Sequence, residues 1–243
     1  MTARIKFSLL HLSFSLALCL IVILFFQFTS YSYPLSLAVN FWHIALIFCA
    51  VDLLIGPFLA FLVYKEGKKS LKFDLSIIIL LQAIAFFYGV YCIFDARPAW
   101  IVYSVDRFEL VKNTDIYIED INKVKPEYRQ APWFGPQFTA VQLSTNKTQR
   151  ERDIFNAVFA ELTLSKQPEK FTDLKTVQSE IISKMQSLVL LSQYNLPQKV
   201  TTILYKYPKA HGFIPLKADK EDMVVLLNGN GEIIKVVDLR PWE

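Results

Sequence analysis

Three apolar runs in the first 95 residues, each long enough to cross a lipid bilayer, constrain this chain more than any other feature. A bilayer core about 30 Å thick requires roughly 20 apolar residues of helix. The runs extend from about Phe7 to Phe28, from Phe41 to Tyr64 and from Phe73 to Phe94. We therefore predict three transmembrane helices within residues 1–95, followed by a charged domain over residues 96–243.

The first run also has the basic start of a secretory signal peptide, because Arg4 and Lys6 precede it. It is longer than the apolar core of roughly 7 to 15 residues found in signal peptides. No clear Ala-x-Ala cleavage site follows it, and two further apolar runs come directly after. These features favour a transmembrane helix over a cleaved signal.

The distribution of basic residues predicts the orientation of the chain. Lys and Arg collect in short cytoplasmic loops. Arg4 and Lys6 precede the first run, and the loop from Lys65 to Lys72 is strongly basic, whereas the loop from Thr29 to Asn40 carries no charge. We expect a bacterial inner-membrane protein with a cytoplasmic N-terminus and a periplasmic C-terminal domain.

Asp52 lies near the middle of the second run, where a carboxylate costs about 2.5 to 3.5 kcal/mol on insertion scales. It should therefore face protein or a polar cavity. Three interpretations stay open: a structural hydrogen bond to Gln82 or Tyr88 with Asp52 protonated, a contact with a partner's transmembrane helix, or an ion or proton pathway. A transporter would normally need more helices and more intramembrane polar groups.

Other residues of the second and third runs are expected at helix contacts. Gly56-Pro57 predicts a kink or a packing notch, because proline removes a helix hydrogen bond and glycine allows close approach. Our candidate contacts with a partner helix are Asp52, Gly56, Pro57, Gln82, Tyr88 and Gly89.

The C-terminal domain is predicted to be α+β, with two helices against a small antiparallel sheet. Apolar residues at helical spacing predict helices over Thr148–Leu164 and Thr172–Leu191. Strands are expected at Ala99–Val111 with a bend at Asp106–Phe108, and at Thr201–Tyr207, His211–Leu216, Met223–Leu227 and Ile233–Leu239. Asn228-Gly229 between the last two strands predicts a hairpin. Proline and glycine favour irregular chain from Asn113 to Phe138, with a short element near Ile116–Val124.

Motifs for catalysis or metal binding are missing from the sequence of this domain. His211 is its only histidine, and Cys19, Cys49 and Cys92 all lie in the apolar runs. A catalytic metal usually needs two or three His or Cys ligands. We predict a protein that is not an enzyme and has no cofactor, metal or small-molecule substrate. The net charge of +4 is weak evidence for nucleic acid, and we predict no such partner.

Two further groups of residues are candidates for surface roles. Asp95, Arg97, Asp106 and Arg107 are expected to form a salt-bridge cluster at the membrane interface. The aromatic residues Trp133-Phe134 and Trp242 are candidate contacts with a partner protein, although such residues are more often core or belt residues.

Several of these residues fall into a pattern that resembles a known family. The pattern comprises Asp-Leu-Leu-Ile-Gly-Pro at 52–57, Lys65 with Gly67-Lys68-Lys69, Leu71–Leu75, Gln82, Ala85, Tyr88-Gly89 and Arg97-Pro98. It resembles the type IV pilin accessory protein family (the TfpX/TfpZ group), best over about Val51 to Val111. The closing Val236–Leu239 and Pro241-Trp242 are similar too.

The resemblance implies a role in type IV pilus biogenesis, as a chaperone-like companion of a particular major pilin. Such a pilin is anchored by one hydrophobic helix before it enters the fibre. We therefore expect the three-helix part to hold that helix in the lipid bilayer through Asp52 and Gly56-Pro57, while the periplasmic domain contacts the pilin head.

Two other functions stay open. One is a membrane-anchored periplasmic binding or sensory module of another envelope system, which a cytoplasmic output domain would favour, but only short basic segments lie on that side. The other is a membrane transferase, which would need convergent acids, bases or metal ligands.

Overall fold

The computed structural model describes residues 2–142 and 162–242, together with Asn146, Thr148, Glu151 and Phe155. The chain divides into two compact units. The helical unit comprises Met1–Thr29 and Phe41–Ala96, and the sheet unit comprises Ser30–Asn40 and Arg97–Glu243. The predicted helix over Thr148–Leu164 falls largely outside the described residues.

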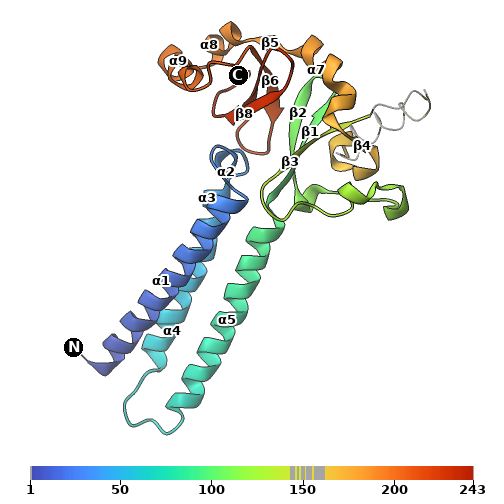
Figure 1. Cartoon of the computed structure of the whole chain (residues 1–243). Helices are drawn as coiled ribbons and strands as arrows, with labels where there is room; N and C mark the ends of the chain where they lie inside the picture. Colours follow the sequence, from blue (N-terminus) through green and yellow to red (C-terminus); the bar gives the residue numbers. More distant parts are fainter. Residues whose placement is uncertain are drawn as a thin grey trace. The chain divides into compact units, whose positions relative to one another are not determined.

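Three helical stretches in the described residues are long and apolar enough to cross a membrane, and they match the three predicted runs. The first is α1 (Ala3–Thr29) and the last is α5 (Leu71–Asp95). The middle one joins α3 (Phe41–Ala50), the π-helix η1 (Val51–Ile55) and α4 (Gly56–Val63). Figure 1 shows these stretches side by side.

The π-helical turn in the middle stretch has a local cause. Pro57 has no N–H, so it cannot donate to the carbonyl of Leu53 four residues earlier. The turn before the proline widens to a π-helix over Val51–Ile55. Asp52 therefore lies in the one turn of this stretch whose backbone departs from regular α-helix.

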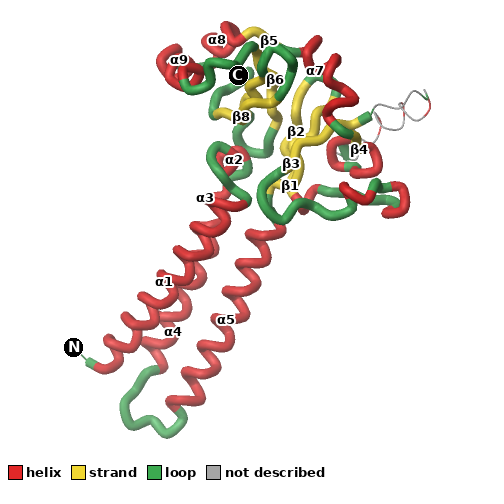
Figure 2. The backbone as a smooth tube through the Cα atoms, in the orientation of Figure 1, coloured by secondary structure: helices red, strands yellow, loops and turns green. Residues whose placement is uncertain are grey.

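The sheet unit is built on a mixed sheet of eight strands in the described residues, with the order β4-β3-β1-β2-β6-β7-β8 and with β5 paired to β6. The strands are β1 (Pro98–Ser104), β2 (Arg107–Lys112), β3 (Gln137–Val141), β4 (Phe171–Thr172), β5 (Gln186–Ser187), β6 (Gly212–Lys217), β7 (Met223–Leu227) and β8 (Ile233–Val237). Figure 2 shows the strands in yellow with short helices around them.

The predicted antiparallel sheet is wrong, because two of its pairings are parallel. Strand β1 pairs with β3, and β2 pairs with β6, in parallel registers. Short turns join β1 to β2, β6 to β7, and β7 to β8, and each of these pairs is an antiparallel hairpin. Parallel neighbours require connections of a dozen residues or more, and the long segments before β3 and β6 supply them.

The segment Ala99–Val111 forms a hairpin of β1 and β2 and not a single strand with a bend. Val105 at the turn has a φ of +61°, a conformation that is uncommon for a β-branched residue. The N–H of Asp106 donates to the carbonyl of Ser104 across this turn. The local sequence therefore predicted the extended conformation of this segment, but it did not predict that the chain reverses direction at Val105.

Two other predicted elements also differ from the structure. The expected helix Thr172–Leu191 is divided into β4, α7 (Gln178–Lys184), β5 and helical turns, because Gln186 and Ser187 pair with β6. The expected strand Thr201–Tyr207 is helical, within α9 (Pro197–Tyr205), since Pro197 occupies the first helical position that proline favours. The strands β6, β7 and β8 confirm the predicted C-terminal strands and their Asn-Gly hairpin.

Short helical elements complete the unit. Residues 113–136 are irregular, as predicted, but β3 at the end of that stretch was missed. The remaining elements are α2 (Leu35–Ala38), α8 (Leu191–Tyr194) and the 3-10 turns η2 (Asn113–Asp115), η3 (Ile121–Lys123), η4 (Pro126–Tyr128), η5 (Leu164–Lys166), η6 (Pro168–Lys170), η7 (Leu174–Val177) and η8 (Leu188–Leu190).

Apolar residues of the C-terminal strands form a core with the helices α8 and α9. Leu191 and Val200 from these helices contact Phe213, Val224 and Leu226 of the strands, and all five are buried. This core holds the helices α8 and α9 against the strands.

The loop between the first two apolar helices is part of the sheet unit. Tyr31, Leu35 and Ala38 are buried, and the carbonyl of Ala38 accepts a hydrogen bond of 2.9 Å from the N–H of Lys220. If the three apolar helices cross a bilayer, this loop and the C-terminal domain lie on the same side of it, as their shared fold requires.

Gly212→Ala should lower the free energy of unfolding of the sheet unit by about 1 to 3 kcal/mol, as overpacking of a core does. A Cβ atom at this position would lie 2.4 Å from Cγ of Met185 and 2.7 Å from the carbonyl oxygen of Gln186. Gly229→Ala is the matched control, because its Cβ would come no closer than 3.7 Å to His211. Thermal unfolding of the full chain in detergent compares the two variants, and equal losses would contradict the packing of β5 on β6.

Candidate functional site

A polar cluster joins the three membrane-length helices of the helical unit. The side-chain amide Nε2 of Gln82 on α5 lies 3.0 Å from Oδ1 of Asp52 and 2.9 Å from Oγ of Ser15 on α1. The thiol of Cys19, one turn further along α1, donates to Oδ2 of Asp52 at 3.5 Å. Asp52 is 4% exposed. Every helix thus contributes a polar group, and these groups bond to one another.

Gly56 and Gly89 of this unit are positions where neighbouring side chains approach closely. A Cβ on Gly56 would lie 2.1 Å from Oε1 of Gln82, and a Cβ on Gly89 would lie 2.5 Å from the ring of Phe48. Both glycines therefore receive a side chain from a neighbouring helix of the same unit. The notch predicted at Gly56-Pro57 is filled from within the chain.

A groove of about 690 Å³ lies beside the polar cluster, between α1 and α5. Its walls are mainly apolar and aromatic, and they include Leu10, Phe14, Leu18, Ile79 and Phe87. Leu10, Phe14 and Phe87 are 70%, 63% and 69% exposed.

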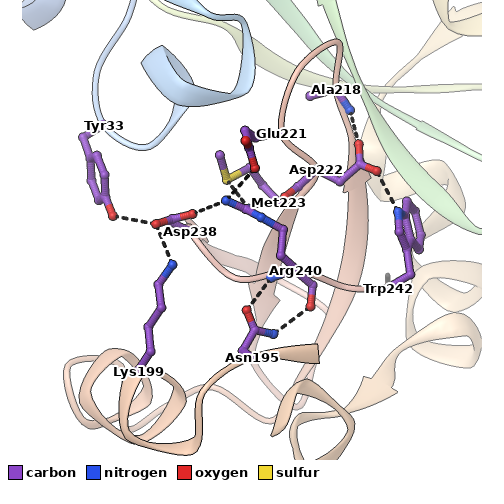
Figure 3. Close-up of polar contacts among 10 residues, drawn as sticks. All are labelled: Tyr33, Asn195, Lys199, Ala218, Glu221, Asp222, Met223, Asp238, Arg240 and Trp242. Carbon is purple, nitrogen blue, oxygen red and sulfur yellow. Dashed lines mark hydrogen bonds and ion pairs between the residues drawn. The ribbon is translucent and has the colours of Figure 1, made fainter. Parts of the chain in front are cut away.

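A second polar network centres on the buried carboxylate of Asp238, just after β8. Oδ2 accepts hydrogen bonds from Nζ of Lys199 at 2.8 Å and from the hydroxyl of Tyr33 at 3.2 Å, and Oδ1 accepts one from Nη2 of Arg240 at 2.7 Å. Figure 3 shows Tyr33 and Lys199 pointing toward this carboxylate. The carboxylate therefore joins the loop Ser30–Asn40, helix α9 and the C-terminal tail.

The tail itself is held by backbone and side-chain contacts. The amide of Asn195 bonds to both the N–H and the carbonyl of Arg240, each at 2.8 Å. Nε1 of Trp242 donates to Oδ2 of Asp222 at 2.6 Å, and Oδ1 of Asp222 accepts from the N–H of Ala218. Figure 3 shows this chain of contacts. The last residues are thus fixed to the turn between β6 and β7.

The charges around Asp238 shift two pKa values in opposite directions. Burial alone would raise the pKa of Asp238, but the hydrogen bond and charge of Lys199 and the charge of Arg240 outweigh it, so this pKa lies below its ordinary value. Burial and the nearby carboxylate of Asp238 raise the pKa of Tyr33. Asp238 is therefore ionised and Tyr33 neutral near pH 7.

Comparison with known proteins finds relatives that align with almost the whole chain. It is 28% identical, over 251 aligned positions, to the fimbrial assembly protein of serogroup I of Dichelobacter nodosus, covering 98% of this chain and 96% of that relative. The corresponding protein of serogroup E1 is also 28% identical, with the same coverage of both chains. This chain is a homologue of fimbrial assembly proteins. The resemblance to the type IV pilin accessory family is confirmed by these relatives. No family model and no solved structure matches the chain.

The structure brings together only some of the predicted partner-helix contacts. Gln82 reaches Asp52, as one interpretation predicted, while Gly56 and Pro57 are buried. Tyr88 is 68% exposed. Asp52 bonds to the chain's own helices and also lines the groove between α1 and α5, whereas the space beside Gly56 is filled by the side chain of Gln82.

The predicted interfacial cluster is divided by strand β1. Arg97 precedes the strand, is buried, and donates from Nε to the carbonyl of Pro132 at 3.0 Å. Asp106 and Arg107 follow the strand and pair with each other at 2.8 Å. A strand of this length spans roughly 20 Å, so Arg97 and the pair Asp106–Arg107 do not form one cluster. Asp95 belongs to the helical unit.

The predicted aromatic contacts have different environments. Trp133 and Phe134 are 65% and 67% exposed. Trp242 is partly buried, bonded to Asp222 and covered on one face by the guanidinium of Arg107 at 5.4 Å from the ring centre. Its contacts are those of a residue that fixes the C-terminal tail.

Sequence reasoning missed the network around Asp238, because its members are far apart in the chain. Tyr33 and Asp238 are separated by 205 positions. The only signal was the closing Val236–Leu239 and Pro241-Trp242, which carried part of the family resemblance. Among the residues described, no group of three or more His, Cys, Asp or Glu side chains could hold a metal ion.

Asp52→Leu should destabilise the helical unit by about 0.6 to 2 kcal/mol, the range measured for interhelical hydrogen bonds in membranes. The substitution removes the acceptor for Gln82 and Cys19. Asp52→Asn retains a carbonyl oxygen and should stay close to the wild type. Unfolding of the full chain by titration with a denaturing detergent measures both variants, and a larger loss in the Asn variant would contradict the assignment.

Asp238→Asn should lower the free energy of unfolding of the sheet unit at pH 7 by about 1 to 3 kcal/mol, because it weakens charge-assisted hydrogen bonds from Lys199 and Arg240. The pKa of Asp238 is depressed in the folded state, so its contribution is present above about pH 4 and is lost as the pH falls through the folded pKa. The difference between wild type and variant should therefore shrink below pH 4. Tyr33→Phe removes one uncharged bond and should keep the pH dependence. A difference that stays constant from pH 3 to 6 would contradict this account.

Proposed function

We propose that this protein is a non-enzymatic accessory factor in fimbrial assembly that holds the fimbrial subunit, a type IV pilin, in the inner membrane. The observation that carries the proposal is the coverage of the relatives. Proteins named for fimbrial assembly align with 98% of this chain, and hence with both the helical unit and the sheet unit. The similarity therefore extends beyond a shared membrane anchor.

The contacts of the polar side chains fit a binding role. Asp52, Gln82, Asp238 and Arg240 bond to partners within the fold, where their contribution is to hold helices, strands and the C-terminal tail together. What remains for a partner is the exposed apolar surface. A chaperone-like factor of this kind requires a surface that matches its client and does not require a reactive group.

The groove between α1 and α5 is our proposed contact for the pilin's hydrophobic helix. Helices associate in membranes through close packing, and the groove offers room for side chains from a neighbouring helix beside the exposed residues Phe14 and Phe87. Asp52 and Gln82 also line this groove, so the proposed contact overlaps the predicted one at Asp52 and leaves out Gly56, where the side chain of Gln82 fills the space. The sheet unit is then available for the part of the pilin outside the membrane.

The proposed orientation follows from charge and from the fold. The basic residues around Arg4 and Lys65–Lys72 favour a cytoplasmic N-terminus. The loop Ser30–Asn40 is uncharged and folds with the C-terminal domain. Both would therefore lie in the periplasm.

Deletion of this protein should reduce surface fimbriae and the amount of pilin in the membrane, and the full chain supplied from a plasmid should restore both. Electron microscopy and immunoblotting of the pilin measure the two effects. A photoreactive amino acid at Phe14 should capture the pilin. A photoreactive amino acid at Leu16 is the control, because Leu16 is also exposed, at 45%. It lies about 200° around the same helix from Phe14, so it should capture little pilin. Unchanged fimbriae and pilin in the deletion strain would remove the proposed function.

A further inference from the structure

Two strands from distant places in the sheet line one pocket of the sheet unit, so the sheet curls. In the strand order, four strands lie between β3 and β8. A flat sheet with about 4.8 Å between neighbours would place these two strands about 24 Å apart. Phe138 of β3 and Val236 of β8 nevertheless line the same pocket of about 270 Å³. Strand β8 therefore faces β3 across an opening of the curled sheet.

Both strands that border this opening have an unpaired edge there. Strand β8 ends the sheet and pairs only with β7 among the described residues. Strand β4 covers β3 only at Ala140 and Val141, so the start of β3 has a neighbour on one side, β1, and none on the other in the described residues. An unpaired edge presents backbone N–H and C=O groups that can bind another extended chain.

The pocket follows the edge of β8. Four consecutive residues of this strand, from Ile233 to Val236, line it. Lys235 and Val236 point to opposite faces of the sheet, because side chains alternate along a strand. A pocket that both residues line therefore lies beside the backbone of β8. The loop Ser30–Asn40 also lines the pocket, but no backbone hydrogen bond joins this loop to β8 in the part of the chain that the structure describes.

The size of the pocket favours an extended segment over a helix as its occupant. An α-helix about 10 Å across fills roughly 400 Å³ per turn, which exceeds the volume of the whole pocket. A strand needs only about 4.8 Å beside its neighbour. It would bond to the outer backbone groups of β8, and its alternate side chains would contact Ile101 and Phe138, which line the pocket.

Lys235 determines which charge the segment should carry. It is exposed, lies at the centre of β8 and forms no ion pair with any described residue. If two copies of β8 paired antiparallel about this centre, Lys235 would lie opposite its own counterpart, and like charges opposite each other destabilise a sheet. A lysine at an open edge is one way in which proteins prevent pairing between copies. A carboxylate opposite Lys235 would instead form a favourable cross-strand pair.

We propose that the pocket between β8 and β3 binds an extended segment of a partner protein, which adds to β8 as a further strand and places an acidic residue opposite Lys235. This inference rests on the proposed function, which makes the fimbrial subunit the partner. The backbone of β8 supplies the affinity, while Lys235 and the apolar wall at Ile101 and Phe138 select the side chains of the segment.

The first test is capture in cells by the full chain. A photoreactive diazirine amino acid at Ser32, which is exposed and lines the pocket, should capture the fimbrial subunit, identified by mass spectrometry. The same amino acid at Tyr117, which is 49% exposed in the same unit but does not line the pocket, should not. Lys235→Glu should lower the yield about fivefold, because it places like charges opposite each other. Lys235→Arg should keep the yield, and so should Lys209→Glu at an exposed lysine outside the pocket.

The second test reads the backbone of β8. Hydrogen exchange of the full chain in detergent is measured with and without the purified fimbrial subunit. Exchange in the peptide that contains Ile233–Val237 should slow about tenfold on binding, because an added strand takes up its outer N–H groups. Exchange in the peptide that contains helix α9 (Pro197–Tyr205) should stay unchanged, since none of its residues lines the pocket.

Several outcomes would overturn the inference. They are equal capture from positions 32 and 117, unchanged exchange of β8 when the subunit is bound, a capture yield that ignores Lys235→Glu while the variant accumulates normally, or capture only of a second copy of this chain. The proposed function is scored separately. If deletion abolishes fimbriae but β8 is neither captured nor protected, only the inference about this pocket fails. If the deletion strain keeps its fimbriae and its pilin, the proposed function itself fails.

Discussion

The sheet unit depends on one buried carboxylate. Asp238 receives hydrogen bonds from Tyr33, Lys199 and Arg240, which come from a loop, a helix and the C-terminal tail. A buried charge is tolerated only when it is paired and hydrogen-bonded, so these three donors must be in place together. The contact with Tyr33 makes the loop Ser30–Asn40 part of this unit, and the contact with Lys199 fixes α9.

The helical unit uses the same principle with uncharged partners. Gln82 donates to Asp52 and Ser15, so one amide links all three helices. In a bilayer no water would satisfy these groups, so their mutual bonding lowers the cost of placing them there. In both units the buried polar groups stabilise the fold, while the proposed contacts with the pilin use an apolar groove and the open edge of β8.

The predictions that succeeded rest on signals local in the sequence. Hydropathy alone gave the three long helices, a mid-helix carboxylate implied a polar neighbour such as Gln82, and Asn228-Gly229 gave the last hairpin. The failures involve distant pairing. Gln186 and Ser187 leave the expected helix because β6 offers them backbone partners, and β2 lies parallel to β6 across a long connection. Neither the burial of Gly56-Pro57 nor the network around Asp238 can be read from spacing, because each partner lies on another element.

The position of the loop Ser30–Asn40 in the chain determines when the sheet unit can fold during synthesis. The sheet unit is discontinuous in the chain, because its first segment, Ser30–Asn40, precedes two of the apolar helices. Tyr33 in this segment bonds to Asp238, which follows it by 205 positions. At the usual bacterial rates of about 5 to 20 residues per second, roughly 10 to 40 s separate the appearance of the two residues. During that interval Tyr31 and Leu35, buried in the finished protein, lack the strands that cover them. The sheet unit can close only after Asp238 has been synthesised, so the residues around Asp238 set the moment at which this unit folds.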